Sequence, residues 1–202
     1  MKGTLFIVTA PSGAGKSTIC DAVLADMERL KYSVSATTRA PRKGEEDGRD
    51  YYFLSRDEFE GMLAEEKFLE HARVYDYYYG TPQEYIEKEL QAGYDLILDI
   101  DLQGARSVKA RNYPAVYIYI LPPSLEVLRQ RLEGRQTDSP EVIEKRFAQA
   151  AGEISAAVEY DYCIINDDLP TAVEEMKSII RAERCRVSRR PGIVESVISG
   201  IS

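Results

Sequence analysis

Nine consecutive residues near the start of the chain have the types and spacing of a phosphate-binding loop, Ala10-Pro-Ser-Gly-Ala-Gly-Lys-Ser-Thr18. Glycines let the backbone wrap around a phosphate with its N–H groups pointing inward, and a following helix N-terminus adds positive potential. Lys16 can reach the β- and γ-phosphates, and the Ser17 hydroxyl is placed to ligate Mg²⁺. The loop therefore predicts ATP binding by Ser12, Gly13, Ala14, Gly15, Lys16, Ser17 and Thr18.

One position departs from the usual phosphate-loop pattern, because Ala10 stands where the first glycine is expected. The half that makes the closest phosphate contacts, Gly13-x-Gly15-Lys16-Ser17, is intact. The alternative is a glycine-rich turn whose Lys16 is only a solvated cation. A lysine at a helix N-terminus opposes the helix dipole, so an anionic group is expected to compensate for it.

A second set of residues has the chemistry to hold a monophosphate. Arg39 and Arg42 lie on a loop, and guanidinium groups bind a dianionic phosphate through paired hydrogen bonds. Tyr51 and Tyr79 could add neutral hydroxyl donors without excess positive charge.

The elements that must position these residues follow an alternating strand and helix pattern. Apolar runs predict strands at Leu5–Thr9, Tyr32–Ala36, Asp95–Ile100, Ala115–Leu121 and Tyr162–Ile165. Helices are predicted at Lys16–Leu30, Leu102–Ala110, Ser124–Leu132 and Thr171–Arg184. This order predicts an α/β fold of the P-loop NTPase type, in which five parallel strands are flanked by helices.

Two excursions interrupt the alternation. Residues 37–93 contain a charged loop, a helical stretch at Arg56–Glu66 and a tyrosine-rich run, and they predict a small inserted α+β lobe. A polar stretch at 134–149 predicts a short helical lid. We expect a single domain over residues 1–202, with a core of 1–36 and 94–202, the insertion at about 37–93 and the lid at about 134–149.

Composition narrows the class of protein. The net charge of −8 argues against nucleic acid or an anionic membrane as a partner, and no apolar run is long enough for a membrane span. Three scattered cysteines and a single histidine, His71, favour neither a disulfide framework nor a zinc site. The sequence predicts a cytoplasmic protein and leaves open whether it forms a homo-oligomer.

Further blocks of sequence resemble the guanylate kinase family in order and spacing. They are Ser33-Val-Ser-Ala-Thr-Thr-Arg-Ala-Pro-Arg42, Gly48-Arg-Asp-Tyr-Tyr-Phe53, Phe68-Leu-Glu-His71 with Tyr79-Gly-Thr81, Ile97-Leu-Asp-Ile-Asp-Leu-Gln-Gly104, and Arg131-Leu-Glu-Gly-Arg135 with Arg146. With the phosphate loop, they span about residues 5–168 and are similar to the bacterial type of the family.

The resemblance implies that this chain uses ATP with Mg²⁺ to phosphorylate GMP, and also dGMP, in purine metabolism and GMP recycling. The implied GMP-binding residues are Ser35, Arg39, Arg42, Tyr51, Glu70, Tyr79, Thr81 and Asp101. A carboxylate at Glu70 could accept hydrogen bonds from both N–H donors of guanine, whereas adenine would leave it unpaired. From residue chemistry alone, Glu70 would be an ordinary exposed glutamate.

The same resemblance assigns the remaining site residues. Lys16, Arg135 and Arg146 are implied to be catalytic, and Arg131, Arg135 and Asn166 to contact ATP. Asp99 lies at the end of an apolar strand, where a P-loop enzyme often places an acidic group near the metal, so an indirect contribution to the Mg²⁺ site is expected. For Asp101, capping of the next helix is an alternative role.

Two other functions remain as alternatives. A related kinase could use another acceptor, such as a ribose phosphate. A guanylate-kinase-like binding module could hold phosphopeptides in the same pocket, although such modules usually lose the phosphate-loop residues that this chain keeps at Lys16 and Ser17.

Overall fold

The main sheet of the protein is parallel and carries the phosphate loop. The computed structural model describes residues 2–74, 76–134 and 140–200. Five strands lie in the order β2-β7-β1-β8-β9, where these are β2 (Leu30–Tyr32), β7 (Asp95–Asp99), β1 (Leu5–Thr9), β8 (Val116–Leu121) and β9 (Tyr162–Ile165). Every neighbouring pair is parallel, as the continuous apolar runs predict.

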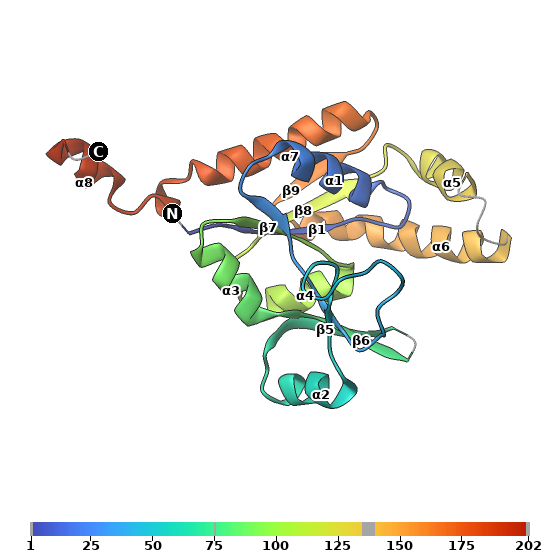
Figure 1. Cartoon of the computed structure of the whole chain (residues 1–202). Coiled ribbons are helices and arrows are strands. Elements are labelled where there is room, and N and C mark those ends of the chain that lie inside the picture. Colours follow the sequence, from blue (N-terminus) through green and yellow to red (C-terminus); the bar gives the residue numbers. More distant parts are fainter. Residues whose placement is uncertain (1, 75, 135–139, 201–202) are drawn as a thin grey trace.

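Helices cover both faces of this sheet (Figure 1). One face packs on α1 (Lys16–Asp26) and α7 (Leu169–Arg184), and the other on α3 (Gln83–Gln91) and α4 (Leu102–Ala110). Side chains along β1 alternate between the two cores: Phe6 and Val8 belong to the first, Leu5 and Ile7 to the second. The predicted α/β class is confirmed.

A second, mixed sheet carries the residues expected to bind the monophosphate. Its order is β4-β3-β6-β5, with β4 (Tyr52–Phe53), β3 (Ala36–Thr37), β6 (Tyr77–Pro82) and β5 (Phe68–Val74). Helix α2 (Arg56–Ala64) packs on it and is closed at its N-terminus by a capping box between Ser55 and Glu58. This sheet and α2 lie together below the main sheet in Figure 1.

The remaining elements lie between β8 and β9 or after α7. Helices α5 (Leu125–Glu133) and α6 (Pro140–Glu153) pack on each other through Leu128, Leu132 and Ala150. A 3-10 helix, η1 (Ile154–Glu159), leads into β9, and η2 (Val187–Arg189) leads to α8 (Ile193–Ser199), which projects from the body (Figure 1). None of the helices in the described ranges is long and apolar enough to cross a membrane.

The single strand predicted at Tyr32–Ala36 is wrong, because the chain changes sheets within it. The backbone N–H of Ser33 still donates to Ile97 O in the main sheet, at 2.8 Å. The carbonyl of Ser35 instead accepts from the N–H of Tyr52, at 2.9 Å, beside the second sheet. Both halves are extended, so local sequence carries no sign of the change of partner.

Two predicted helices end earlier than expected. The helix predicted at Lys16–Leu30 ends at Asp26, since Met27 is extended and Arg29 adopts a left-handed conformation at φ 58°. The helix predicted at Arg56–Glu66 ends at Ala64, and Glu66 has φ 54°. In both places a left-handed residue turns the chain toward the next strand.

The second sheet depends on one aromatic side chain. Phe59 is fully buried and stacks between Phe68 and Tyr78, with ring centroids 4.3 and 5.4 Å away. We expect Phe59→Ala to lower the free energy of unfolding by about 3–5 kcal/mol, because it leaves a cavity that cannot fully collapse. Urea unfolding measures this; Val158→Ala, at a side chain 90% exposed, is the control and should change little. An equal, small effect of both changes would contradict this packing.

Candidate functional site

The phosphate loop joins β1 to α1 in the conformation that anion binding requires. Gly13 and Gly15 have φ values of 93° and 91°, which a residue with a side chain rarely adopts. The N-cap residue of α1 is Gly15, which has no side chain with which to cap the helix. Its first N–H groups are therefore available to a phosphate, with the helix dipole favouring negative charge.

Lys16 is held by the end of the neighbouring strand. Its ammonium group forms an ion pair with Asp99 and donates to Ile100 O at 3.3 Å. Strands β1 and β7 are parallel neighbours, so their carboxyl ends bring Lys16 and Asp99 together. Asp99 is thus the anionic group expected to offset a lysine at a helix N-terminus.

A pocket of about 330 Å³ lies over the loop. Besides the loop it is lined by Asp101 and by Gln149 and Glu153 of α6. The lining includes six residues of the predicted ATP set, namely Ser12, Gly13, Gly15, Lys16, Ser17 and Thr18, whereas Ala14 is buried beneath them. An adjoining pocket of about 310 Å³ shares Ser12 and includes Arg146. The structure therefore brings Arg146 close to the loop; Arg135 lies outside the described residues.

Asn166, which follows β9, holds the phosphate loop against the end of that strand. This buried amide donates from Nδ2 to Ala14 O at 2.7 Å, and its own backbone carbonyl accepts from Arg131 at 2.9 Å. A Cβ added to Gly15 would lie 2.3 Å from Asn166 Nδ2, so the glycine permits this close approach. Arg131 and Asn166, both predicted ATP residues, are joined to the loop by this chain of contacts.

We expect Asn166→Ala to weaken ATP use. The change leaves a buried backbone carbonyl unpaired and frees the loop, so kcat/KM for ATP should fall by roughly tenfold. Initial rates at saturating GMP measure it, with Asp167→Ala, at the exposed neighbour, as control. If KM for ATP and kcat were unchanged, the loop would not depend on this contact.

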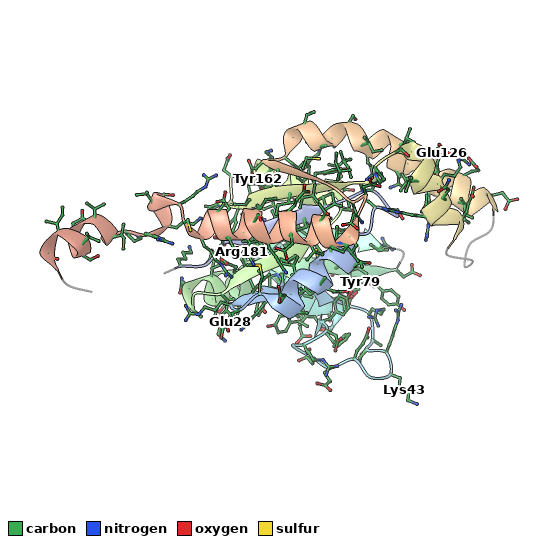
Figure 2. The ribbon with its side chains drawn as sticks, turned by 90° about the horizontal axis from the view of Figure 1, so that it is seen from above. Glu28, Lys43, Tyr79, Glu126, Tyr162 and Arg181 are labelled. Carbon is green, nitrogen blue, oxygen red and sulfur yellow. The ribbon has the colours of Figure 1, made fainter. Side chains whose placement is uncertain are left out.

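A loop that projects from the second sheet between β3 and β4 carries Arg39, Arg42 and Tyr51, and Tyr79 of β6 lies beside it. Figure 2 shows Lys43 at its outer tip and Tyr79 nearer the body. The guanidinium carbon of Arg39 lies 5.5 Å from the Tyr51 ring centroid, and the Tyr51 and Tyr79 rings are 6.0 Å apart. Three of the four predicted phosphate-binding side chains are thus in mutual contact, with Arg42 exposed on the same loop.

Glu45 organises this loop and is missing from the sequence-based prediction. Its carboxylate accepts from both terminal nitrogens of Arg39, at 3.0 and 2.9 Å, and from the backbone N–H of Arg42 at 2.6 Å. Hydrogen bonding by Arg39 lowers the pKa of Glu45, and bonding to Glu45 first, then Tyr79, raises the pKa of Arg39. A carboxylate therefore engages the donors that would bind a phosphate. In the sequence, the position of Glu45 three residues after Arg42 is the only feature that could have indicated this role.

Glu70 differs most from the expectation of an exposed glutamate. It lies in β5 and is only 7% exposed. The Thr81 hydroxyl donates to its Oε1 at 2.6 Å. Burial raises the pKa of the Glu70 carboxyl, with a smaller contribution from the charge of Asp101. A desolvated carboxylate is suited to a ligand that donates hydrogen bonds.

The start of α4 connects this carboxylate to the phosphate loop. The Asp101 side chain caps the helix by accepting from Gly104 N at 2.8 Å, so the capping alternative is confirmed. A Cβ on Gly104 would lie 3.3 Å from Glu70 Oε2. The segment 99–104 therefore touches Lys16 at one end and Glu70 at the other. Ser35, half-buried, precedes β3 beside the strand that carries Thr81.

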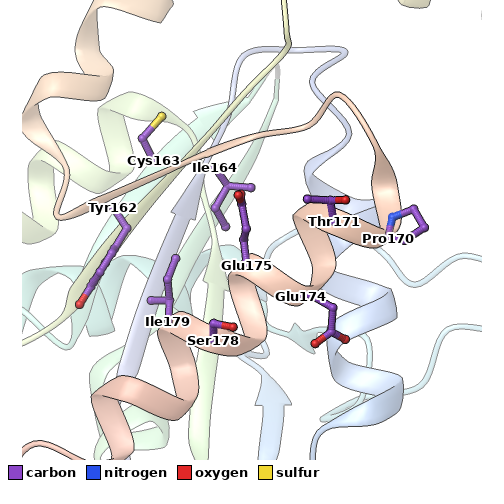
Figure 3. Close-up of a pocket in the computed structure, with 9 residues that line it drawn as sticks. All are labelled: Tyr162, Cys163, Ile164, Pro170, Thr171, Glu174, Glu175, Ser178 and Ile179. Carbon is purple, nitrogen blue, oxygen red and sulfur yellow. The ribbon is translucent and has the colours of Figure 1, made fainter.

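A larger cavity of about 650 Å³ lies elsewhere, between β9 and α7 (Figure 3). Its walls are mostly apolar, from residues such as Ile164 and Ile179, with Glu174 and Glu175 on the helix. No residue of the predicted site lines it. Size alone would point to the wrong place, because the convergent charged and polar groups lie at the phosphate loop and in the second sheet.

Comparisons with known proteins agree with this geometry. The family model described as guanylate kinase matches residues 2–183. A guanylate kinase of Desulfitobacterium hafniense (strain Y51) is 49% identical over 195 residues, covering 96% of this chain and 98% of that protein. One from Geobacter sulfurreducens is 50% identical over 198 residues, covering 98% of both. The crystal structure of guanylate kinase from Anaplasma phagocytophilum superposes with a TM-score of 0.72 at 35% identity, over 98% of this chain and 95% of that one.

The fold, the phosphate loop and these matches define a P-loop nucleoside monophosphate kinase. The chain belongs to the guanylate kinase family.

Proposed function

We propose that this protein transfers the γ-phosphoryl group of ATP to GMP, and also to dGMP, giving ADP and the guanosine diphosphate. The observation that carries the proposal is the segment 99–104. It pairs with Lys16 of the phosphate loop at one end and closes on the buried Glu70 at the other. Donor and acceptor sites thus share one rigid support, at the carboxyl end of β7.

On the donor side, the loop amides and Lys16 hold the phosphates of ATP. A hydroxyl at Ser17 and a carboxylate at Asp99 are hard oxygen donors of the kind that Mg²⁺ prefers, so the donor set fits this metal, with Ser17 direct and Asp99 indirect. Bound Mg²⁺ would supply neutralisation of the charge on the phosphates. Arg131 and Asn166 would contact ATP from the side where they fasten the loop.

On the acceptor side, Arg39, Arg42, Tyr51 and Tyr79 bind the GMP phosphate. The phosphate takes over the Arg39 donors that Glu45 engages here. The guanine N–H donors bind to Glu70, while Ser35, Thr81 and Asp101 contact or support the base edge. Tyr79 and Thr81 lie two residues apart in β6, so both side chains stand on one face of the strand.

Transfer is direct, since the site needs no covalent intermediate. The residues align a GMP phosphate oxygen with the γ-phosphorus, and Lys16, Arg135 and Arg146 stabilise the charge that develops. Water must be excluded from the site, because the γ-phosphoryl group of ATP would otherwise be transferred to water. The insertion at about 37–93 and the lid at about 134–149 are the parts of the single domain that we expect to close over the substrates; residues 135–139 of the lid lie outside the described ranges.

The wider setting also remains a proposal. The sequence favours a cytoplasmic enzyme whose partners are ATP and GMP rather than nucleic acid or membrane. A homo-oligomer is compatible with this function.

An acceptor panel tests the proposal. ADP release is followed with GMP, dGMP, AMP, UMP and ribose 5-phosphate, each with Mg²⁺ and with excess chelator. We expect rapid, Mg²⁺-dependent release with the guanine nucleotides alone. A preference for a ribose phosphate or another base would overturn the GMP assignment, and tight phosphopeptide binding without turnover would indicate a binding module.

A further inference from the structure

A second charged pocket lies far from the proposed active site. It has a volume of about 230 Å³ and is lined by five basic residues and one acidic residue, Lys2, Arg29, Arg184, Arg189, Arg190 and Asp95. In Figure 1 the N-terminus lies beside the segment that follows α7, so segments from both ends of the chain meet here. The proposed function uses none of these residues.

The pocket lies at the amino ends of the central strands. Thr4 precedes β1 and lines the pocket, and Asp95 is the first residue of β7. The phosphate loop follows the opposite end of β1. At about 3.3 Å per residue, a strand of this length separates the two places by about 17 Å. The pocket is therefore distinct from the nucleotide site.

Contacts with the protein fix some of these cations and leave others free. Arg184 donates to Asp95 at 2.7 Å and to Glu28 O at 2.9 Å, and Arg190 donates to Arg184 O at 3.3 Å. Within residues 2–74, 76–134 and 140–200, no ion pair or side-chain hydrogen bond holds Arg29 or Lys2. The pocket thus combines pre-oriented guanidinium groups with unengaged donors.

The balance of charge at the pocket is opposite to that of the chain. Five cations and one carboxylate line the pocket, and Arg189 also pairs with the buried Glu183 at 3.6 Å, whereas the protein as a whole carries a net charge of −8. Arg184 alone is explained as a basic residue in the last turn of α7, where it complements the helix dipole. That role does not account for Arg29, which comes from the turn between α1 and β2, or for Lys2. An anion bound in the pocket would lower the mutual repulsion of these cations.

We propose that this pocket binds a polyphosphate anion. Guanidinium groups bind phosphate oxygens through paired hydrogen bonds. The five cations exceed Asp95 and Glu183 by three positive charges, more than the charge of about −2 on a monophosphate, so a chain of two or three phosphates fits the pocket better. The anion is either free inorganic polyphosphate or the phosphate tail of a nucleotide, which share this chemistry.

Calorimetric titration with inorganic triphosphate tests the proposal, in low salt without Mg²⁺. The phosphate loop also binds such anions, so three variants are compared with the unaltered protein. Arg29→Gln/Arg190→Gln should lose a binding site, or weaken it by roughly tenfold or more, and Lys16→Ala should keep that site. Arg181→Gln, an exposed arginine of α7 outside the pocket, is the matched control and should bind as the unaltered protein does.

Two results would overturn the proposal: loss of all binding in Lys16→Ala, or unchanged binding in the double variant. Thermal unfolding and GMP-dependent ADP release check that each pocket variant is folded. Lys2→Gln serves as a second pocket variant if the double variant is unstable, and should weaken the same site. Repeating the titration with ATP identifies the source: a second ATP site lost in the pocket variants indicates a nucleotide tail, and its absence indicates the free anion.

Discussion

Replacing Lys16 with alanine is expected to lower kcat by about 10²- to 10³-fold while leaving the protein folded. Lys16 is the only loop residue with a charged side chain. Its positive charge complements the negative charge on the phosphoryl group in transfer. It is held at the site by Asp99 and Ile100 O. Since this interaction strengthens as charge develops, its loss should appear mainly in kcat rather than in KM for GMP. Steady-state rates with ATP and GMP measure it.

The control for this change is a lysine with similar contacts elsewhere. Lys31 forms an ion pair with Glu89 at 2.7 Å and lies over the Tyr94 ring at 3.5 Å. Lys31→Ala should leave turnover unchanged, and both variants should unfold cooperatively in urea. Asp99 is partly exposed, so losing Lys16 does not leave a fully buried charge. Near-normal turnover of Lys16→Ala would contradict its assigned role.

Replacing Glu70 with glutamine should have the second-largest effect, confined to the acceptor. The change turns one acceptor oxygen into an N–H donor facing the guanine donors. Losing a hydrogen bond to a charged group, about 1.5–3 kcal/mol, should lower kcat/KM for GMP by about 10- to 100-fold. The KM for ATP should stay the same. Glu84→Gln, at an exposed carboxylate of α3, is the control. Unchanged GMP use in Glu70→Gln would refute the assignment.

In Glu70→Gln, the free energy of unfolding should rise although the activity with GMP falls. Burial raises the pKa of Glu70 above its usual value, so the folded protein binds this proton more tightly than the unfolded chain. Its contribution to stability therefore declines as pH rises from the ordinary carboxyl pKa through the raised one. Glu70→Gln keeps the acceptor for Thr81 and removes this decline. The variant should be more stable than the unaltered protein at neutral pH, with the difference shrinking in acid.

The residues that sequence predicts best are those whose place depends on one local rule. The phosphate loop is readable because glycines, Lys16 and Ser17 must follow a strand and begin a helix. Asp99 could be paired with it because neighbouring parallel strands end at the same edge of a sheet. Capping of α4 by Asp101 also depends on a short segment.

Other features depend on contacts that no local pattern records. Burial of Glu70 requires Thr81 and Gly104 from two other elements. Glu45 gains its role from the turn that folds it back on Arg39. The split of the predicted strand after Tyr32 arises because extended chain can pair with either sheet. Resemblance to a family supplies the GMP residues, whereas residue chemistry alone would have left Glu70 on the surface.

Comparing GMP with IMP as acceptors tests the central claim most directly. IMP keeps the phosphate, the ribose and the N1–H donor of GMP and lacks only the exocyclic amine. If Glu70 reads both guanine donors, kcat/KM should be at least about tenfold higher for GMP, from the loss of one charged hydrogen bond. This preference should shrink in Glu70→Gln. Equal use of GMP and IMP by the unaltered protein would contradict recognition of guanine by this carboxylate.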